Sequence, residues 1–329
     1  MPLNSPCGHI AYCREFAAFC RLWTSVCLNR EIKMNQTFIS SLILVLLGGV
    51  LNAAETHLQF TARASQVNDA THQATEMVLA AERSIRHQNQ IVATSQQKMH
   101  RSQDRVVTIL KTAEGKPIQA RIDYGDSTTR VEASEQRNVK VIQPIAHKTY
   151  FVTRDGDQLL FANETGKQIT EEEDKLLQQQ FQNFGKPNPL AEFLDGKRIS
   201  IGQSIDVPED VARELLGLTG HDGKTDRLSL RLVDRKAVAG SECGVFETIL
   251  RTSSDETSMS LLMKGQIVVD PATCQTKAIR LQGPVAISET RGPTEGRFVV
   301  STNGSLQVNL KSIPQSSIET ASTNATQRR

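Results

Sequence analysis

Residues 261–281 read LLMKGQIVVDPATCQTKAIRL, and this stretch decides the expected fold. Its first part alternates between apolar and polar positions, which is typical of a β-strand with one buried face. Asp270-Pro271-Ala272-Thr273 then supplies turn residues, and the segment Cys274–Leu281 follows with a second apolar pattern. We therefore expect two antiparallel strands joined by a short turn.

The same pattern recurs on both sides of this stretch, from 227 to 311. Leu228, Leu230 and Leu232 alternate with polar residues. The expected turns are Ala239-Gly240, Gly283-Pro284, Gly292-Pro293 and Asn303-Gly304, the last one joining Phe298–Val300 to Leu306–Leu310 as a hairpin. The predicted fold class is therefore α+β: a curved antiparallel β-sheet, a half-barrel-like meander, with a few short helices.

The middle of the chain carries signals for a hairpin and two helices. Asp155-Gly156 lies between two apolar segments and predicts a tight hairpin. Thr170 with Glu173 forms a capping box, which predicts a helix that stops at Gly185. Pro208 suits the first position of a second short helix.

The segment 66–100 permits two interpretations. Its apolar residues fall close to helical spacing, and this local pattern slightly favours one long helix. The alternative is a pair of long strands that turn at His87–Gln90. Beyond it, Arg105–Lys111 predicts a strand that pairs across a turn with Ile118–Tyr124.

An export signal precedes these elements. Lys33-Met34 is followed by the apolar core Phe38–Leu51 and by small residues at Ala53-Ala54. We interpret 34–54 as a signal peptide and 1–33 as an over-extended start, the alternative being an unusually long basic region. The mature protein is then periplasmic or extracellular. It has no stable transmembrane segment, since the apolar core is shorter than the roughly 20 residues that a spanning helix needs.

The mature chain is expected to form one β-rich domain over 55–311. Its parts are an N-terminal part (55–144), a helix-containing middle (145–218) and the β-meander (219–311), and 312–329 is expected to be a disordered tail. Without residues 1–53 the basic and acidic residues balance. This balance does not favour nucleic acid as a partner, because nucleic-acid surfaces need clustered basic residues.

Two cysteines remain in the mature chain, Cys243 and Cys274. An oxidising compartment favours a disulfide between them, and two buried or free thiols are the alternative. The other four cysteines fall within 1–33 and lack the paired spacing of a zinc site.

Candidates for chemistry are weak. Gly240–Gly244 lacks the spacing of a nucleophile elbow, and Arg154–Asp157 lacks the remaining ligands of a calcium loop, so both are read as turns. His221-Asp222 has no identifiable nucleophile beside it. The chain contains no phosphate-binding loop, zinc-protease or dinucleotide fingerprint. We therefore assign no catalytic, cofactor-binding or metal-binding residue and do not expect an enzyme.

Several turn elements carry a resemblance. Lys148–Phe151 with the hairpin after it, Gly185–Pro189 and Lys197–Ser204 resemble uncharacterised exported bacterial β-rich envelope proteins. The resemblance implies an envelope β-domain without an assigned activity. In architecture the chain is also similar to half-barrel lipoprotein carriers, which hold acyl chains on a concave sheet. It lacks their lipid-anchoring cysteine, although some soluble carriers lack it too.

Three functions follow from these observations. The first is a non-catalytic envelope protein that binds a partner protein, a polymer or a lipid on its curved sheet. The second is a soluble carrier of an apolar ligand, with an open cavity lined by Leu261, Met263, Ile267, Val269, Ile279 and Leu281. The third is an unrecognised hydrolase, in which His221 or His147 meets an acidic or hydroxyl partner in a cleft.

Overall fold

The computed structural model describes residues 57–88, 90–133, 136–165, 167–215, 224–254, 259–291 and 297–315. The predicted signal peptide and the segment before it lie outside these residues. So do the turn at Gly292-Pro293 and the pair His221-Asp222.

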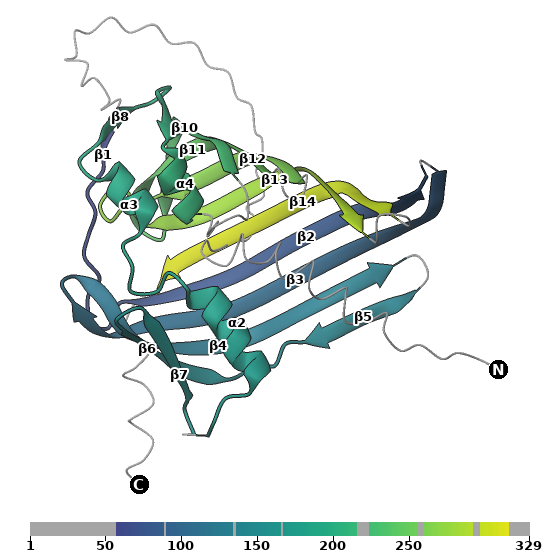
Figure 1. Ribbon diagram of the computed structural model, residues 1–329. Coiled ribbons are helices and arrows are strands. Elements are labelled where there is room, and N and C mark those ends of the chain that lie inside the picture. The colour runs from purple at the N-terminus through teal and green to yellow at the C-terminus, as the bar shows by residue number, and fades with distance from the viewer. Residues whose placement is uncertain are drawn as a thin grey trace, which may run out of the picture.

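One antiparallel sheet of twelve strands dominates the structure (Figure 1). The strands run in the order β7-β6-β4-β3-β2-β14-β13-β12-β11-β10-β9, and β5 pairs with β4 beside this path. The sheet is curved and does not close on itself, which confirms the predicted fold class. Its strands are β2 (Ala70–His87), β3 (Gln90–Ala113), β4 (Lys116–Ala133), β5 (Gln136–Ile142), β6 (Thr149–Asp155), β7 (Gln158–Asn163), β9 (Ser204–Val207), β10 (Lys224–Val238), β11 (Ser241–Ser254), β12 (Met259–Val269), β13 (Thr276–Arg291) and β14 (Phe298–Pro314).

Three described helices and a small second sheet accompany it. The helices are α2 (Glu171–Phe181), α3 (Pro189–Leu194) and α4 (Glu209–Leu215), and β1 (His57–Gln59) pairs with β8 (Arg198–Ser200). The helices lie on one face, which we call the inner face, with α2 over β4 and with α3 and α4 near β10 (Figure 1). In the described part of the chain, no helix has the length and apolar character needed to cross a membrane.

The ambiguous segment 66–100 forms two strands, so the helical interpretation is wrong. β2 and β3 pair from Ala70 opposite Thr108 to His87 opposite Gln90, where the chain turns as the second interpretation predicts. The reason is tertiary burial. Met77, Leu79 and Ala81 occupy every second position of the strand, so all three point to one face, where they are buried. In a helix the same residues would be spread around the axis.

Most predicted turns are confirmed. Asp155 pairs with Gln158 across the Asp155-Gly156 hairpin, and Val238 pairs with Ser241 across Ala239-Gly240. Asp270 begins the turn that joins β12 to β13, where its carboxylate accepts a hydrogen bond from the backbone N–H of Ala272 at 3.0 Å. Thr170 and Glu173 form both hydrogen bonds of the capping box at the start of α2.

Two predicted breaks are wrong, because Gly283 and Gly304 lie inside long strands. β14 runs without interruption through Asn303-Gly304, and β13 runs through Gly283-Pro284. Both glycines allow the backbone of the neighbouring strand to approach closely, because they carry no Cβ. A Cβ on Gly304 would lie 2.2 Å from the carbonyl oxygen of Ala80, and a Cβ on Gly283 would lie 1.8 Å from that of Leu262. β14 also continues to Pro314, past the boundary predicted at 311, and pairs there with β2.

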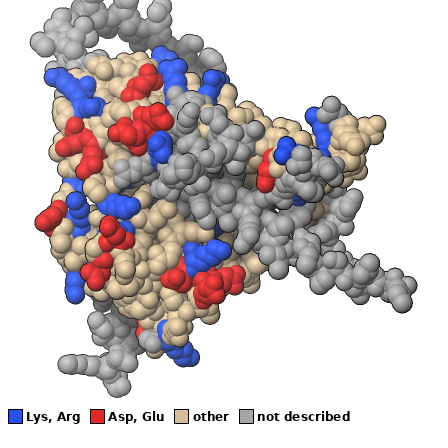
Figure 2. Space-filling view, viewed as in Figure 1, with Lys and Arg blue, Asp and Glu red and all other residues tan. Residues whose placement is uncertain are grey.

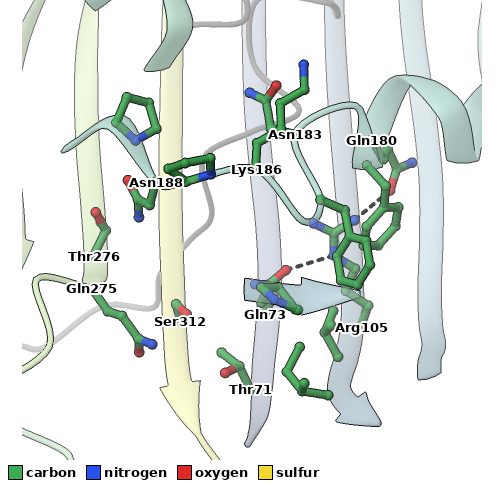
Figure 3. Close-up of a pocket in the computed structure, with 17 residues that line it drawn as sticks. Thr71, Gln73, Arg105, Gln180, Asn183, Lys186, Asn188, Gln275, Thr276 and Ser312 are labelled. Atoms are coloured by element: carbon green, nitrogen blue, oxygen red, sulfur yellow. Dashed lines mark hydrogen bonds between the residues drawn. The ribbon is translucent and has the colours of Figure 1, made fainter. Parts of the chain in front are cut away.

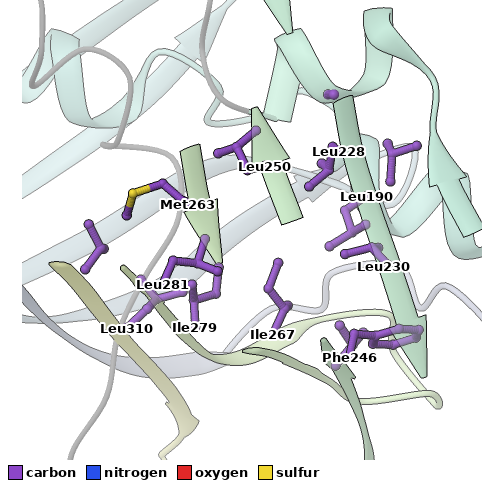
Figure 4. Packing of buried hydrophobic residues seen from close by; sticks show 14 of the residues in the cluster. Leu190, Leu228, Leu230, Phe246, Leu250, Met263, Ile267, Ile279, Leu281 and Leu310 are labelled. Carbon is purple, nitrogen blue, oxygen red and sulfur yellow. The ribbon is translucent and has the colours of Figure 1, made fainter. Parts of the chain in front are cut away.

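The inner face carries two hydrophobic clusters. The larger one spans β2, β3 and β9–β14 together with α3 and α4, and part of it is drawn in Figure 4. The smaller one packs Leu177 and Phe181 of α2 against Ile122, Tyr150 and neighbouring residues of β4, β6 and β7. The opposite, outer face is mainly polar, as expected for an antiparallel sheet with one buried face.

Candidate ligand-binding face

All six residues of the predicted apolar face lie together in the larger cluster. Leu261, Met263, Ile267 and Val269 come from β12, and Ile279 and Leu281 come from β13. Figure 4 shows four of these side chains gathered on one side of the strands. Each of the six is at most 4% exposed, and neither of the two cavities described below includes any of them. The structure therefore packs them in one apolar cluster, and the open cavity predicted for these six residues is not found at them.

This surface continues across the sheet far beyond those two strands. Leu228 lies opposite Leu250, and Leu250 lies opposite Met263. Gly283 follows on β13, with Leu306 opposite it on β14. On the far side Leu79 of β2 lies opposite Met99 of β3. We call this row of residues the apolar band: Leu228, Leu250, Met263, Gly283, Leu306, Leu79 and Met99.

The apolar band crosses seven strands, from β10 to β3. With neighbouring strands about 4.8 Å apart, its length is on the order of 30 Å. A second apolar row runs beside it on the same face: Leu232, Phe246, Ile267, Ile279 and Leu310. The described helices lie over only one part of this face (Figure 1). The band is nevertheless buried, because its leucines and methionines are each at most 7% exposed.

Methionine is concentrated in this cluster. Met77, Met99, Met259 and Met263 are the methionines within the described residues, and all four belong to it. Methionine is flexible and polarisable, so it fills irregular space and is common on surfaces that adapt to different apolar partners. The sequence analysis found Met263 through strand alternation but missed Met77 and Met99, because the strands that bear them were ambiguous.

A second feature of the inner face is a cavity of about 330 Å³ between the sheet and the loop that joins α2 to α3. Its polar lining includes Gln73, Arg105, Gln180, Lys186 and Ser312, and its apolar lining includes Val107, Phe181 and Phe184 (Figure 3). A shallower hollow of about 410 Å³ lies on β2, β3 and β4 around Ala81, Gln97 and Ala133.

Arg105 is the central polar residue of the 330 Å³ cavity. It is only 9% exposed, and its guanidinium lies 4.7 Å from the centre of the Phe181 ring. Its Nε donates to Gln73 at 2.9 Å and its Nη1 donates to Oε1 of Gln180 at 2.8 Å. Tyr124 donates to the same oxygen of Gln180 at 2.9 Å. Burial raises the pKa of Tyr124, and the positive charge of Arg105 partly offsets this shift.

Sequence reasoning did not identify this polar group. Arg105 appeared only as the first residue of a predicted strand, and polar residues at strand ends are common. The available signal was that Gln73, Arg105 and Gln103 occupy inward-facing positions on β2 and β3, where an apolar residue is the ordinary choice.

A carboxylate holds α2 in place beside this cavity. Glu173 accepts hydrogen bonds from Lys148 at 2.8 Å, from the hydroxyl of Tyr150 at 2.6 Å and from the backbone N–H of Thr170 at 2.7 Å. Burial disfavours its charged form, but these hydrogen bonds outweigh burial and lower the pKa of Glu173 to about 2. Burial and the contact with Glu173 raise the pKa of Tyr150.

Cys243 and Cys274 are free, buried thiols in the structure, so it does not contain the predicted disulfide. The two residues belong to different clusters. Cys243 packs with Val245 and Val268, whereas Cys274 packs in the larger cluster of the inner face. Burial is the main cause that raises the pKa of both thiols to about 11; the next cause is the carboxylate of Asp270 for Cys243 and that of Asp195 for Cys274.

We therefore expect both cysteines to be unreactive in the native protein, because the thiolate is the reactive form. Iodoacetamide at pH 7.5 should leave Cys243 and Cys274 unmodified. In denaturant without reductant it should label both, as read by peptide mass spectrometry. A disulfide-linked peptide containing both residues would contradict the structure.

The candidates for catalysis do not assemble into a site within the described residues. His147 meets an acidic partner, Asp126, at 3.2 Å, but the two side chains are 67% and 81% exposed. Ala239-Gly240 and Asp155-Gly156 are hairpin turns. Among the described residues no group of His, Cys, Asp and Glu could hold a metal ion. On the face seen in Figure 2, basic and acidic side chains are interspersed.

Comparisons with known proteins leave the family open. No family model matches the chain, and none of the curated proteins matches it. Among solved structures, lipovitellin, from a study of lipid–protein interactions, aligns with a TM-score of 0.35 and 6% identity. The match covers 77% of this chain and 26% of lipovitellin, so the chain spans about a quarter of that protein. MucB in complex with MucA aligns with a TM-score of 0.10 and 11% identity over 74% of this chain and 93% of MucB.

Proposed function

We propose that this protein is a non-catalytic binding protein that holds an apolar ligand on the inner face of its sheet after export from the cytoplasm. The observation that carries the proposal is the apolar band. It crosses seven strands on one face, and the described helices lie over only part of that face. The leucines and methionines of the band are at most 7% exposed, so the ligand would take the place of the packing that now buries them.

The methionines support an adaptable apolar site. Met99 lies at the end of the band that is far from α3 and α4, Met77 lies next to the band on β2, and Met263 lies near its centre. Flexible side chains at these positions let the face adapt to an alkyl chain, which has no fixed shape. A partner protein would instead meet polar groups that form a specific hydrogen-bonded rim. The proposal that the protein is exported rests on the predicted signal peptide. The mass of the secreted protein tests whether that peptide has been removed.

The test uses N-phenyl-1-naphthylamine, an uncharged apolar fluorophore, and the full chain. We expect saturable binding with increased fluorescence. The Leu79→Gln variant, which places an amide in the apolar band, should weaken binding by about tenfold, because full burial of a leucine is worth about 1.5–3 kcal/mol. Val78→Gln is the matched control: Val78 neighbours Leu79 on β2 but points to the outer face.

The control separates binding from stability. Both variants are compared at a temperature well below their measured Tm values. Absence of saturable binding to the unaltered protein, or an equal effect of both substitutions, would contradict the proposed function.

A further inference from the structure

The 330 Å³ cavity combines a positive charge with apolar walls. Of the residues that line it, Arg105 and Lys186 are basic and none is Asp or Glu (Figure 3). Its apolar lining includes Val107, Phe181 and Phe184. Its volume falls within the ordinary range of about 300–1,000 Å³ for small-molecule sites. A cavity of this character suits a ligand with a negative charge and an apolar part.

Arg105 lacks a counter-charge. The described chain brings no carboxylate within ion-pair distance of its guanidinium, and the two hydrogen bonds it donates go to the neutral amides of Gln73 and Gln180. A further hydrogen bond joins its side chain to Tyr124, which is also uncharged. A buried charge is costly unless it is paired, so a guanidinium that is 9% exposed and lines a cavity is a ready partner for an anion.

Gln180 provides an unused donor. Its Oε1 already accepts from both Arg105 and Tyr124, which fixes the orientation of the amide. Its Nε2 is buried and finds no hydrogen-bond partner among the described residues. Buried donors without partners are rare in native proteins, but an atom this enclosed can meet a ligand acceptor only after the Gln180 side chain moves.

The cavity adjoins the apolar surface. Ser312 lines the cavity, and Leu310 lies two residues earlier on β14, on the same face and about 7 Å away. Leu310, Val308 and Leu306 then continue along β14 as buried apolar residues of the larger cluster and reach the apolar band at Leu306. These side chains are only 1–2% exposed, so an alkyl chain whose head lies at Arg105 can follow this apolar row only if the packing over it opens on binding.

We propose that Arg105, with Gln180 beside it, binds the anionic head group, a carboxylate or a phosphate, of an amphiphile whose alkyl chain follows β14 to the apolar band. This inference rests on the proposed function and adds the chemical class of the ligand. Lys186 is exposed at the rim, where its charge attracts the anion at longer range.

The test is isothermal titration calorimetry on the full chain with decanoate, decyl phosphate, 1-decanol and inorganic phosphate. We expect decanoate or decyl phosphate to bind at least about tenfold more tightly than decanol, because charge-assisted hydrogen bonds contribute about 1.5–3 kcal/mol. Whichever of the two anions binds more tightly identifies the head group. Inorganic phosphate alone should bind far more weakly than decyl phosphate.

Variants locate the head-group site. Arg105→Gln should remove the preference for the anions and leave decanol affinity unchanged, and Arg105→Lys should retain part of the preference. Lys186→Gln removes a charge from an exposed position, so it should keep the fold and weaken decanoate binding by about 2–3-fold. Arg280→Gln removes a charge from the outer face of β13 and should change nothing.

The outcomes separate the two proposals. Equal binding of decanoate and decanol to the unaltered protein would overturn the head-group site and leave the proposed function standing. Failure of every alkyl probe to bind would overturn both. Inorganic phosphate that binds as tightly as decyl phosphate would show that the alkyl chain takes no part, which contradicts the path along β14.

Discussion

Replacing Lys277 with methionine should destabilise the fold by about 3–5 kcal/mol, the largest stability effect that we expect from a single substitution. Lys277 and Asp270 are each 4% exposed, and their charged atoms are 3.3 Å apart. The pair holds the turn between β12 and β13, where Asp270 also accepts from the backbone of Ala272. Without the lysine, Asp270 is a buried carboxylate with no counter-charge.

Urea denaturation of the Lys277→Met variant measures this loss. The double variant Lys277→Met with Asp270→Asn should recover part of the stability, since the asparagine carbonyl can still accept from Ala272 and no charge remains buried. Lys264→Met removes an exposed lysine of the neighbouring strand and should change stability by less than about 0.5 kcal/mol. A double variant no more stable than Lys277→Met would argue against an unpaired charge as the cause.

Replacing Glu173 with glutamine should cost about 2–3 kcal/mol at pH 7 and very little at pH 2. The pKa of Glu173 is about 2 in the folded protein, below the value near 4.3 of an unfolded glutamate. A lowered pKa means that the carboxylate contributes its full stabilisation above the unfolded value. That stabilisation disappears as the pH falls from about 4.3 towards 2.

Denaturation of the unaltered protein and of Glu173→Gln at pH 7, 4 and 2 tests this prediction. The difference between the two should shrink steadily as the pH falls. Glu172→Gln is the matched control, because Glu172 is the exposed neighbour in the same first turn of α2. A difference between the unaltered protein and Glu173→Gln that is the same at all three pH values would show that the glutamate charge does not stabilise α2 on the sheet.

The sequence was sufficient to predict the parts of the fold that rest on local chemistry. Alternation in 261–281, the Asp155-Gly156 hairpin and the capping box at Thr170 all depend on residues close together in the chain, and the structure confirms each of them. The curved antiparallel sheet followed from the repetition of such signals.

Features set by distant contacts could not be predicted in this way. Asn303-Gly304 has the composition of a hairpin turn, yet Gly304 lies inside β14 because Ala80 and Ala81 of β2 approach it closely. The pairing of β2 with β3 was hidden by helical spacing of the same apolar residues. Arg105 is recognisable as unusual only once Gln180, 75 positions later, is seen to share its cavity.

Methionine methyl NMR tests the central claim, an apolar ligand on the inner face, most directly. The full chain carries ¹³C-methyl methionine and is titrated with 1-decanol, with assignments from single Met→Leu variants. The account predicts saturable shifts of the Met77, Met99 and Met263 methyl signals, because these residues lie in or next to the apolar band. Saturable binding of decanol that leaves all three signals unmoved would place the ligand elsewhere and contradict the account.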